Sequence, residues 1–600
     1  MDKRKLIFTS LIVLALVVAT LSITYALNVN VTQNTTSDYD LSYTFDISDN
    51  ATWTINLEAG KTKIYEISIT NPYSDSIKYG IVYKMDNPTT MPDNSLVGIV
   101  STSENFSQGS INSNSTINVS IAVVNSSTSN MQVTLSVISG YKNGGELIIP
   151  DGYTLITDEY DIVTNEPNSP DLVQGLIPVM YDGSKWVKAD SSNSNETYKW
   201  YDYNNKLWAN AVLVTSTNRS TYQSANPGTT ISTSDILAFY VWIPRYKYKV
   251  WNINKVIGTD SYDAYNTGID IVFESEKAST GTISCTYSYA EPSSDANSPN
   301  ETCTGSNGDY YTHPAFTFGS DELRGFWIGK FELTGDSSKL TILPNVSSLI
   351  AKTVSSFSTM IQNMQTSNNI YGLNTSRINT DSHLLTNYEW GAVAYLTNSK
   401  YGRCTNGSCT EVTKNNCSSH ITGIGADSVS ASESSSTCTT AANKYNGAKG
   451  VLASTTGNIT GVYDMSGGAW ETTMGNMSST SGSYTFCPAN SEFSSNWYTT
   501  STAKYVTTYA YVSSYTISKN QTAYNKGRLG DATGEIVLSS GSGWYSDMAS
   551  FMYSGSGSWS GRGGGYYNDS NSGIFSLAGD QGVPAAAVGS SRAALVSLSA

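Results

Sequence analysis

Three short motifs near the C-terminal end do most to limit the fold of this 600-residue chain. Residues 461–471 read Gly-Val-Tyr-Asp-Met-Ser-Gly-Gly-Ala-Trp-Glu, a glycine turn that leads into a Trp-Glu pair. Residues 562–565 read Arg-Gly-Gly-Gly, and residues 591–595 read Ser-Arg-Ala-Ala-Leu. Glycine tolerates backbone angles that other residues avoid, so the glycine-rich motifs predict tight turns beside strands. A spaced set of three motifs is more specific than any one of them.

This set resembles the domain of the formylglycine-generating enzyme family, whose fold is a variant of the C-type lectin fold. Residues 239–248 resemble the family's opening strand, and residues 325–334 resemble its second strand. Leu384, Leu385, Thr386, Glu389 and Trp390 fit a helix that begins Leu-Pro-Thr-Glu-x-Glu-Trp in that family. The resemblance implies an α+β C-type lectin-like domain over residues 236–600. The family contains oxidases as well as many members that only bind.

The N-terminal part shows period-two hydrophobic patterns. Apolar residues alternate with polar ones in three stretches, at Tyr65, Ile67 and Ile69, at Ile117, Val119, Ile121 and Val123, and at Val133, Leu135 and Val137. This alternation predicts strands with one buried face, and Gly, Asn and Pro between them predict turns. Residues 28–155 are therefore expected to form an all-β, immunoglobulin-like sandwich that serves as a spacer or assembly module. The whole chain is predicted to be multidomain.

A linker is predicted at residues 164–170, followed by an aromatic, β-rich segment at 165–235. Its aromatic residues are read as the core of a small sheet, with a sugar-stacking platform as the alternative: Trp186, Trp200, Tyr201, Tyr203 and Trp208. Residues 239–248 read as one long strand. Residues 275–310 are expected to be an inserted loop closed by a disulfide.

Two helices are predicted in the last domain. Apolar residues recur at helical spacing from Ile350 to Met364. Thr386 and Glu389 form a capping-box pattern, which predicts that a second helix begins after Thr386. His383 beside this box is expected to make a hydrogen bond at the helix terminus.

The first residues predict export. Residues 2–5 are mostly basic, residues 6–21 are apolar, and Thr24-Tyr25-Ala26 offers a cleavage site. Residues 1–26 are therefore a signal peptide, or a membrane anchor if they remain uncut. The net charge of −15 argues against nucleic acid as a partner, because no basic stripe could neutralise phosphates. We expect a secreted or cell-surface protein that meets membrane only through this segment.

Cysteine usage agrees with an oxidising compartment. All 7 cysteines lie between Cys285 and Cys487. Nearness in sequence predicts three disulfides and leaves Cys487 over: Cys285 with Cys303, Cys404 with Cys409, and Cys417 with Cys438.

The family resemblance implies a calcium site at the glycine turn. Its ligands would be the carbonyl oxygens of Ser466, Gly467 and Ala469 and the carboxylate of Glu471. Gly468 stands where the family commonly has Asn, and Thr472 replaces a second Trp. A structural Trp-Glu turn, whose carboxylate caps backbone amides, is the alternative. Arg592 is expected to be a structural tie.

The family's oxidases bind copper through two cysteines near the C-terminal end, since thiolates suit a cuprous ion. No cysteine follows Cys487 in this chain, so no copper is expected. Residues 559–577 instead resemble the variable proteins of diversity-generating retroelements. That resemblance assigns ligand contacts to five residues: Tyr566, Tyr567, Asn568, Asp569 and Asn571. An ordinary polar loop is the alternative.

These observations predict a non-catalytic extracellular binding protein, adhesin-like or receptor-like, that recognises a glycan or a protein through its C-terminal domain. One alternative is a divergent oxidase that uses Cys487 or another cysteine. A second alternative is a structural subunit of a surface coat.

Overall fold

The computed structural model shows two compact β-rich units, Met1–Val163 and Thr164–Ala600. It describes residues 28–33, 52–59, 61–72, 74–92, 95–100, 108–125, 127–139, 147–157, 159–160, 166–277, 281, 283–291, 300–366, 368–374, 379–429, 438–513, 527–580, 582 and 589–598. The predicted export segment 1–26 lies outside these ranges. Within them, the structure has no helix of the length and apolarity needed to cross a bilayer.

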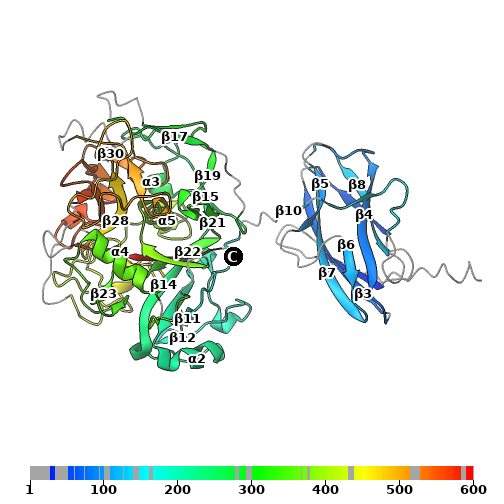
Figure 1. The fold of residues 1–600 in the computed structure, drawn as a ribbon, viewed down its shortest axis with the longest axis horizontal. Coiled ribbons are helices and arrows are strands. Elements are labelled where there is room, and N and C mark those ends of the chain that lie inside the picture. Colours follow the sequence, from blue (N-terminus) through cyan, green and yellow to red (C-terminus); the bar gives the residue numbers. More distant parts are fainter. Residues whose placement is uncertain are drawn as a thin grey trace, which may run out of the picture. The chain divides into compact units, whose positions relative to one another are not determined.

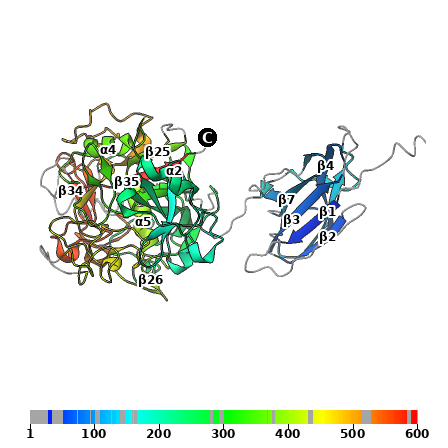
Figure 2. The same cartoon turned by 90° about the horizontal axis from the view of Figure 1, so that it is seen from below.

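The first unit consists of two five-stranded sheets (Figures 1 and 2). One sheet has the order β1 (Asn28–Gln33), β3 (Thr62–Asn71), β7 (Ser115–Val124), β5 (Leu96–Val100), β10 (Glu159–Tyr160). The other has the order β2 (Thr52–Leu57), β8 (Met131–Ser139), β4 (Ile77–Asn87), β6 (Gln108–Ile111), with β9 (Thr154–Leu155) paired to β4.

Side chains from both sheets form a single core in this unit. Ile67 of β3 lies opposite Val119 of β7, and both are fully buried. Ile55 of β2 lies opposite Val133 of β8 in the second sheet, and both join the same core. The predicted period-two pattern is confirmed, because alternate residues of each strand point to this core.

A seven-stranded sheet forms the centre of the second unit (Figure 1). Its order is β12 (Trp186–Lys188), β11 (Ile177–Tyr181), β13 (Asn210–Val214), β14 (Ile236–Pro244), β22 (Gly325–Gly329), β35 (Ala593–Ser597), β25 (Thr380–Leu384). The strand next to the chain end, β35, thus lies between β22 and β25. Every residue of β14 is buried, which explains its continuous apolar sequence.

The predicted long strand over residues 239–248 is interrupted. β14 ends at Pro244, and β15 (Tyr246–Lys249) pairs instead with β16 (Ile271–Phe273) and β19 (Tyr310–Thr312). Arg245 lies between the two strands, with its Nε 3.2 Å from Glu274 Oε2 and its Nη1 2.7 Å from Glu322 Oε2. The fully buried Arg245 thus marks the point at which the chain passes from one sheet to the other.

Segment 165–235 does not form a separate structural unit. Its strands β11, β12 and β13 belong to the central sheet, and β13 pairs directly with β14. The boundary predicted at residue 235 therefore runs through one sheet. Four of the aromatic residues are buried, which agrees with the core interpretation: Trp186, Trp200, Tyr203 and Trp208.

A second sheet carries the glycine motifs. Its order is β29 (Thr507–Tyr509), β28 (Trp470–Met477), β32 (Trp559–Arg562), β33 (Leu577–Asp580), with β34 (Gly589–Ser590) paired to β28. Short two-stranded ribbons complete the unit: β17 (Cys285–Tyr287) with β18 (Glu301–Cys303), β20 (Thr317–Phe318) with β21 (Asp321–Glu322), β23 (Thr334–Gly335) with β24 (Leu340–Thr341), β26 (Cys404–Thr405) with β27 (Ser408–Cys409), and β30 (Val537–Ser539) with β31 (Ser542–Gly543).

The described α-helices all belong to the second unit: α2 (Ser216–Ser224), α3 (Ala264–Thr267), α4 (Val354–Asn363) and α5 (Asn387–Thr397). Both predicted helices are present, as α4 and α5. The capping box is also confirmed, because Thr386 Oγ1 accepts from the Glu389 amide at 3.2 Å and Glu389 Oε2 accepts from the Thr386 amide at 2.8 Å. Ten of the 11 residues of α5 are buried, so this helix lies inside the unit rather than on its surface.

The three predicted disulfides are the disulfides of the structure: Cys285–Cys303, Cys404–Cys409 and Cys417–Cys438. Two of them join residues directly opposite each other in a ribbon, β17 with β18 and β26 with β27. Cys487 is free and buried.

Candidate functional site

Two successive glycines make the turn that precedes β28. Gly467 and Gly468 have φ values of 76° and 74°, in the left-handed region that glycine favours. A Cβ on Gly467 would lie 2.3 Å from the Asn415 carbonyl oxygen, and a Cβ on Gly468 would lie 2.5 Å from Glu332 Oε1. Both positions therefore need glycine, including position 468, where the resembled family commonly has Asn.

Arg592 connects this turn to both sheets. Its Nη2 lies 2.5 Å from Glu471 Oε1, and its Nε lies 2.9 Å from Glu471 Oε2. The same guanidinium donates to the carbonyl oxygens of Gly329 at 2.8 Å and Tyr463 at 2.9 Å. Burial raises the pKa of Glu471 to about 7, and the attraction of Arg592 opposes this rise. Arg592 is thus a structural tie, as expected from the sequence.

The predicted calcium ligands are already engaged in part. The carboxylate of Glu471 has an arginine on both oxygens, and the Ser466 carbonyl oxygen accepts from the Asn415 amide at 2.8 Å. Calcium takes six to eight oxygen ligands, so the proposed ion would need Glu471 to give up a bidentate ion pair. These contacts favour the structural-turn alternative, although the carboxylate binds a guanidinium rather than backbone amides. Calcium through Ser466, Gly467, Ala469 and Glu471 stays a prediction.

Two more carboxylates lie buried beside this pair. Glu332 Oε1 accepts from the Ala469 amide at 3.0 Å, and Asp464 Oδ1 accepts from the Gly423 amide at 2.8 Å. Burial, together with the neighbouring carboxylates, raises the pKa of Glu332 well above its usual range, and burial raises the pKa of Asp464. Backbone amides thus hold both side chains in place, while burial favours their uncharged forms.

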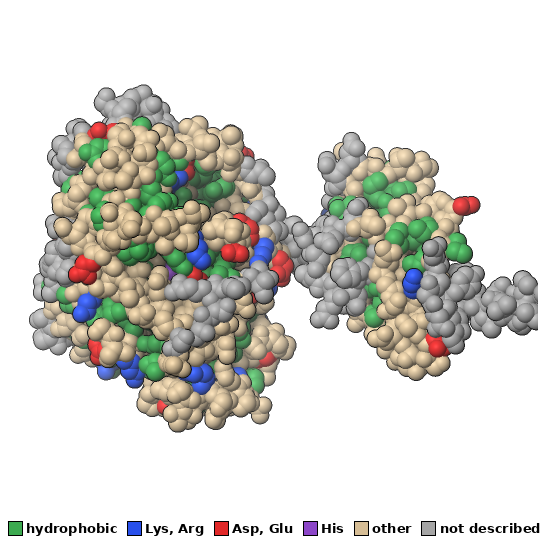
Figure 3. All heavy atoms as spheres, viewed as in Figure 1, with side chains coloured by type: hydrophobic (Ala, Val, Ile, Leu, Met, Phe, Trp, Pro, Cys, Tyr) green, Lys and Arg blue, Asp and Glu red, His purple; other side chains and the backbone are tan. Residues whose placement is uncertain are grey.

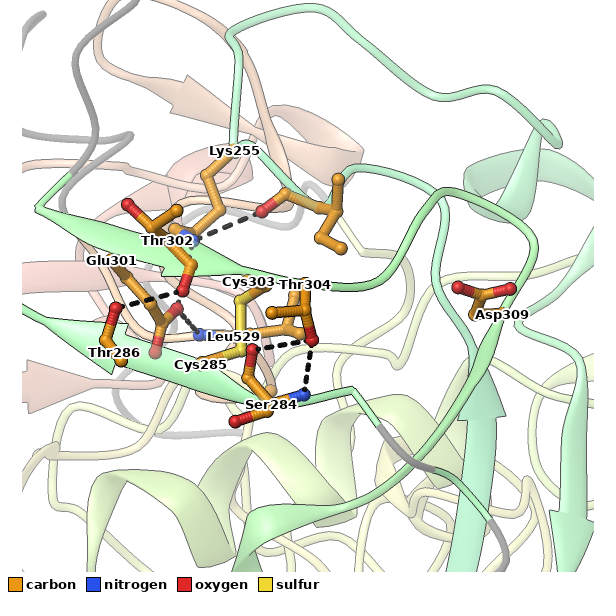
Figure 4. Close-up of a disulfide and its surroundings, with 12 residues drawn as sticks. Lys255, Ser284, Cys285, Thr286, Glu301, Thr302, Cys303, Thr304, Asp309 and Leu529 are labelled. Atoms are coloured by element: carbon orange, nitrogen blue, oxygen red, sulfur yellow. Dashed lines mark hydrogen bonds and ion pairs between the residues drawn. A yellow bond between two sulfur atoms is a disulfide. The ribbon is translucent and has the colours of Figure 1, made fainter.

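Among the described residues, one group of candidate metal ligands lies close together in space, but its atoms are already bonded to other groups. Cys285, Glu301 and Cys303 place their ligand atoms within 4.8 Å of one another. The two sulfurs are bonded to each other, and Glu301 Oε2 is 3.0 Å from Lys255 Nζ and 2.7 Å from the Leu529 amide (Figure 4). The ribbon is a disulfide-closed connection that anchors residues far apart in sequence.

The predicted ligand loop lies directly beside the glycine turn. The Tyr566 amide donates to the Gly468 carbonyl oxygen at 2.9 Å, so the two motifs meet in space. Asn568 Oδ1 accepts from the Gly565 amide at 2.8 Å, and Ser572 Oγ donates to the Gly565 carbonyl oxygen at 2.6 Å. These hydrogen bonds hold the loop backbone in one conformation.

The five predicted contact residues differ in exposure. Tyr567 is 41% exposed, Asp569 and Asn571 are exposed, and Tyr566 and Asn568 are half-buried. Behind the loop, Phe575 is fully buried and fixes the chain to the unit. The loop thus offers polar and aromatic side chains outward from an apolar support.

The structure adds residues that the sequence did not single out as ligand contacts. Half-buried Trp470 lies beside Tyr567, where burial raises the pKa of the tyrosine and Trp470 lowers it. The Tyr566 ring lies 5.0 Å from His420, and Lys414 Nζ donates to the Asp569 carbonyl oxygen at 3.1 Å. Strand alternation could not have identified Trp470, because every later residue of β28 is buried and a charged neighbour such as Glu471 is expected to face outward. His420 and Lys414 come from a distant loop and have no local signal.

Comparisons with known proteins add little to this geometry. No protein-family model and no curated protein matches the chain. A solved structure of envelope protein VP37 from White Spot Syndrome Virus aligns with 19% of this chain and 92% of its own length, at 16% identity and a TM-score of 0.12. A TM-score this low supports no argument about fold or function.

Proposed function

We propose that this protein is a non-catalytic extracellular binding protein that recognises a glycan through the loop at residues 566–571. The supporting observation is the group formed by Trp470, Tyr566 and Tyr567 beside Asp569 and Asn571, on a loop whose backbone is fixed by hydrogen bonds. Rigid aromatic rings with adjacent amide and carboxylate groups suit the stacking and hydrogen bonding that sugar recognition needs.

The proposal includes the two domain families. The two-sheet first unit agrees with an immunoglobulin-like sandwich. The second unit, in which α5 is buried between loop-rich sheets and Arg592 joins the glycine turn to the last strand, agrees with a C-type lectin-like domain of the formylglycine-generating type. Three disulfides favour a secreted or cell-surface location.

Cysteine chemistry does not favour the oxidase alternative. Six of the 7 cysteines are paired in disulfides, and the remaining one, Cys487, is buried. A two-thiolate copper site would need two free cysteines in one accessible place.

A glycan array that compares the native chain with a Tyr566→Ala/Tyr567→Ala variant tests the proposal. We expect the native chain to bind a defined set of glycans and the variant to lose that binding. Tyr262→Ala, which removes an exposed tyrosine outside the loop, is the control and should bind like the native chain. Equal binding by the native chain and the double variant would refute the role of the loop. Binding to an immobilised protein but to no glycan would show that the chain recognises a protein instead of a glycan.

A further inference from the structure

A pocket of about 580 Å³ lies in the second unit, between three segments that are far apart in sequence. β19 and the residues after it form one wall, the beginning of α5 forms another, and residues 503–506 form the third. None of the lining residues belongs to the loop at 566–571: Gly281, Tyr311, Thr312, Pro314, Thr317, Gly319, Tyr388, Ala503, Lys504 and Val506. Its volume falls in the range of small-molecule sites, which is about 300–1,000 Å³.

Two phenol hydroxyls in this pocket are free to bind a ligand. Tyr311 and Tyr388 both line the pocket, and neither hydroxyl has a hydrogen-bond partner among the described residues. Burial raises the pKa of Tyr311 to about 12 and raises that of Tyr388 well above its usual range, with Arg528 opposing the rise at Tyr388. Both groups are therefore protonated at neutral pH and can donate as well as accept.

Lys504 is the charged residue of the lining, and the interior holds it in place. Its Nζ lies 3.3 Å from Asp381 Oδ2 and 4.5 Å from the centre of the Phe318 ring. The Tyr505 hydroxyl donates to the same Asp381 oxygen at 2.6 Å. An ammonium group fixed in this way loses less conformational entropy when it binds a ligand than one on a free side chain.

A buried histidine offsets the carboxylates behind Lys504. His383 lies 3.5 Å from Asp381 Oδ1 and 3.1 Å from Glu389 Oε1. Although burial opposes its charge, Glu389 and Asp381 raise the pKa of His383 to about 9. The two carboxylates thus face two cations, His383 and Lys504, so the cluster has no net charge and Lys504 is the member that lines the pocket. Basic side chains are few and scattered on the face shown in Figure 3, and the chain has a net charge of −15. A lysine that lines a pocket is therefore unusual in this protein.

We propose that this pocket binds an acidic saccharide, with its carboxylate against Lys504 and its hydroxyls against Tyr311 and Tyr388. Pro314, Ala503 and Val506 supply apolar surface for the C–H face of the sugar ring. The site is separate from the loop at 566–571, so it stands whether or not that loop binds a ligand.

Calorimetric titration of the full chain tests this proposal with three sugars. Glucuronate carries the carboxylate, glucose lacks it, and methyl glucuronide keeps it while blocking the anomeric position as a glycosidic link does. We expect glucuronate to bind about tenfold more tightly than glucose, because a charge-assisted hydrogen bond is stronger than a neutral one. If methyl glucuronide binds like glucuronate, the ligand is the terminal sugar of a glycan. If only glucuronate binds, the ligand is a free sugar acid.

Three variants locate the binding. Lys504→Met should abolish the preference for glucuronate over glucose, and Tyr388→Phe should weaken both acids about threefold by removing one hydroxyl. Tyr388→Phe also tests the site if Lys504→Met fails to fold after losing its ion pair. Lys339→Met, which removes an exposed charge elsewhere, should bind glucuronate like the native chain. No glucuronate binding, or binding that Lys504→Met and Tyr388→Phe leave unchanged, would overturn the proposal.

Discussion

The two units bury different kinds of polar groups. In the described part of the first unit, the buried polar side chains are uncharged, and the amide of Asn125 illustrates their role. Asn125 Nδ2 donates to the carbonyl oxygens of Leu57, Glu58 and Ser129 at 2.8–3.1 Å, and so closes the ends of neighbouring strands. Regular strands satisfy most backbone groups through their ladders, so a few amides suffice.

The second unit buries complete ionic groups. Lys330 Nζ donates to Asn210 Oδ1 at 2.8 Å and to the carbonyl oxygens of Ile459 and Gly461 at 2.7 and 2.8 Å. Burial lowers the pKa of this lysine well below its usual range, whereas its three acceptors favour the ammonium form, which has three hydrogens to donate. The long loops of the second unit leave carbonyl oxygens and amides without a strand partner, and charged side chains supply the missing hydrogen bonds. The loop-rich unit therefore needs long-range polar contacts in addition to its apolar core, whereas the first unit relies on its strand ladders and its apolar core.

The largest effect should follow from Arg592→Met in the second unit. The change leaves Glu471 buried without its cation and removes donors from the carbonyl oxygens of Gly329 and Tyr463. Breaking a buried pair by removing one partner typically costs about 3–5 kcal/mol. Urea unfolding should show this loss in the transition of the second unit alone. Lys185→Met, at an exposed site, is the control and should leave both unfolding transitions unchanged. If Arg592→Met also left them unchanged, the second unit would not depend on its buried ion pairs.

Removal of the Cys285–Cys303 disulfide should have a smaller effect. The bond joins residues 18 apart, and closing a loop of this size constrains the unfolded chain by about 3 kcal/mol. Cys285→Ser/Cys303→Ser should therefore lower the free energy of unfolding of the second unit by about that amount. Reductant should not change the first unit, which has no cysteine. A shift of the first transition by reductant would show that the two units do not unfold independently.

The pH dependence of stability should distinguish the units. Burial raises the pKa of Glu535 from its ordinary value of 4.5 to about 8. The native state therefore keeps a proton that the unfolded state releases near pH 4.5, so this stabilisation is complete below that pH and is lost as pH rises toward 8. The limit is about 1.4 kcal/mol per pH unit, or about 3 kcal/mol between pH 5 and 7.

Glu535→Gln imitates the protonated acid and should flatten this dependence. Comparison of the two curves removes contributions from other groups, including His383, whose raised pKa has the same sign. The measurement is the free energy of unfolding at a series of pH values. Parallel curves for the native chain and the variant would mean that Glu535 ionises normally in the folded state.

Local patterns predicted the parts of this fold that depend on local interactions. The capping box lies within four residues, each disulfide joins two cysteines that are consecutive along the chain, and strand alternation identified the core of the first unit. The interruption at Arg245 was missed, because its partners Glu274 and Glu322 lie 29 and 77 residues away in the chain. For the same reason, the tie at Arg592 was expected but its partner Glu471 was not. The pocket at Lys504 has no local signal, because three distant segments form it.

The smallest effect should come from Thr386→Ala at the capping box. The change removes the oxygen that accepts from the Glu389 amide, and it also removes a donor to Glu389 Oε2 at 2.9 Å. Loss of an N-cap typically costs about 1 kcal/mol, and here the helix is buried, so a lost partner is not replaced by water. Thr386→Ser keeps the hydroxyl and should cost much less. If Thr386→Ala and Thr386→Ser lower the free energy of unfolding equally, the threonine methyl group stabilises the start of the helix by packing. The hydroxyl hydrogen bonds of the capping box would then contribute little to stability.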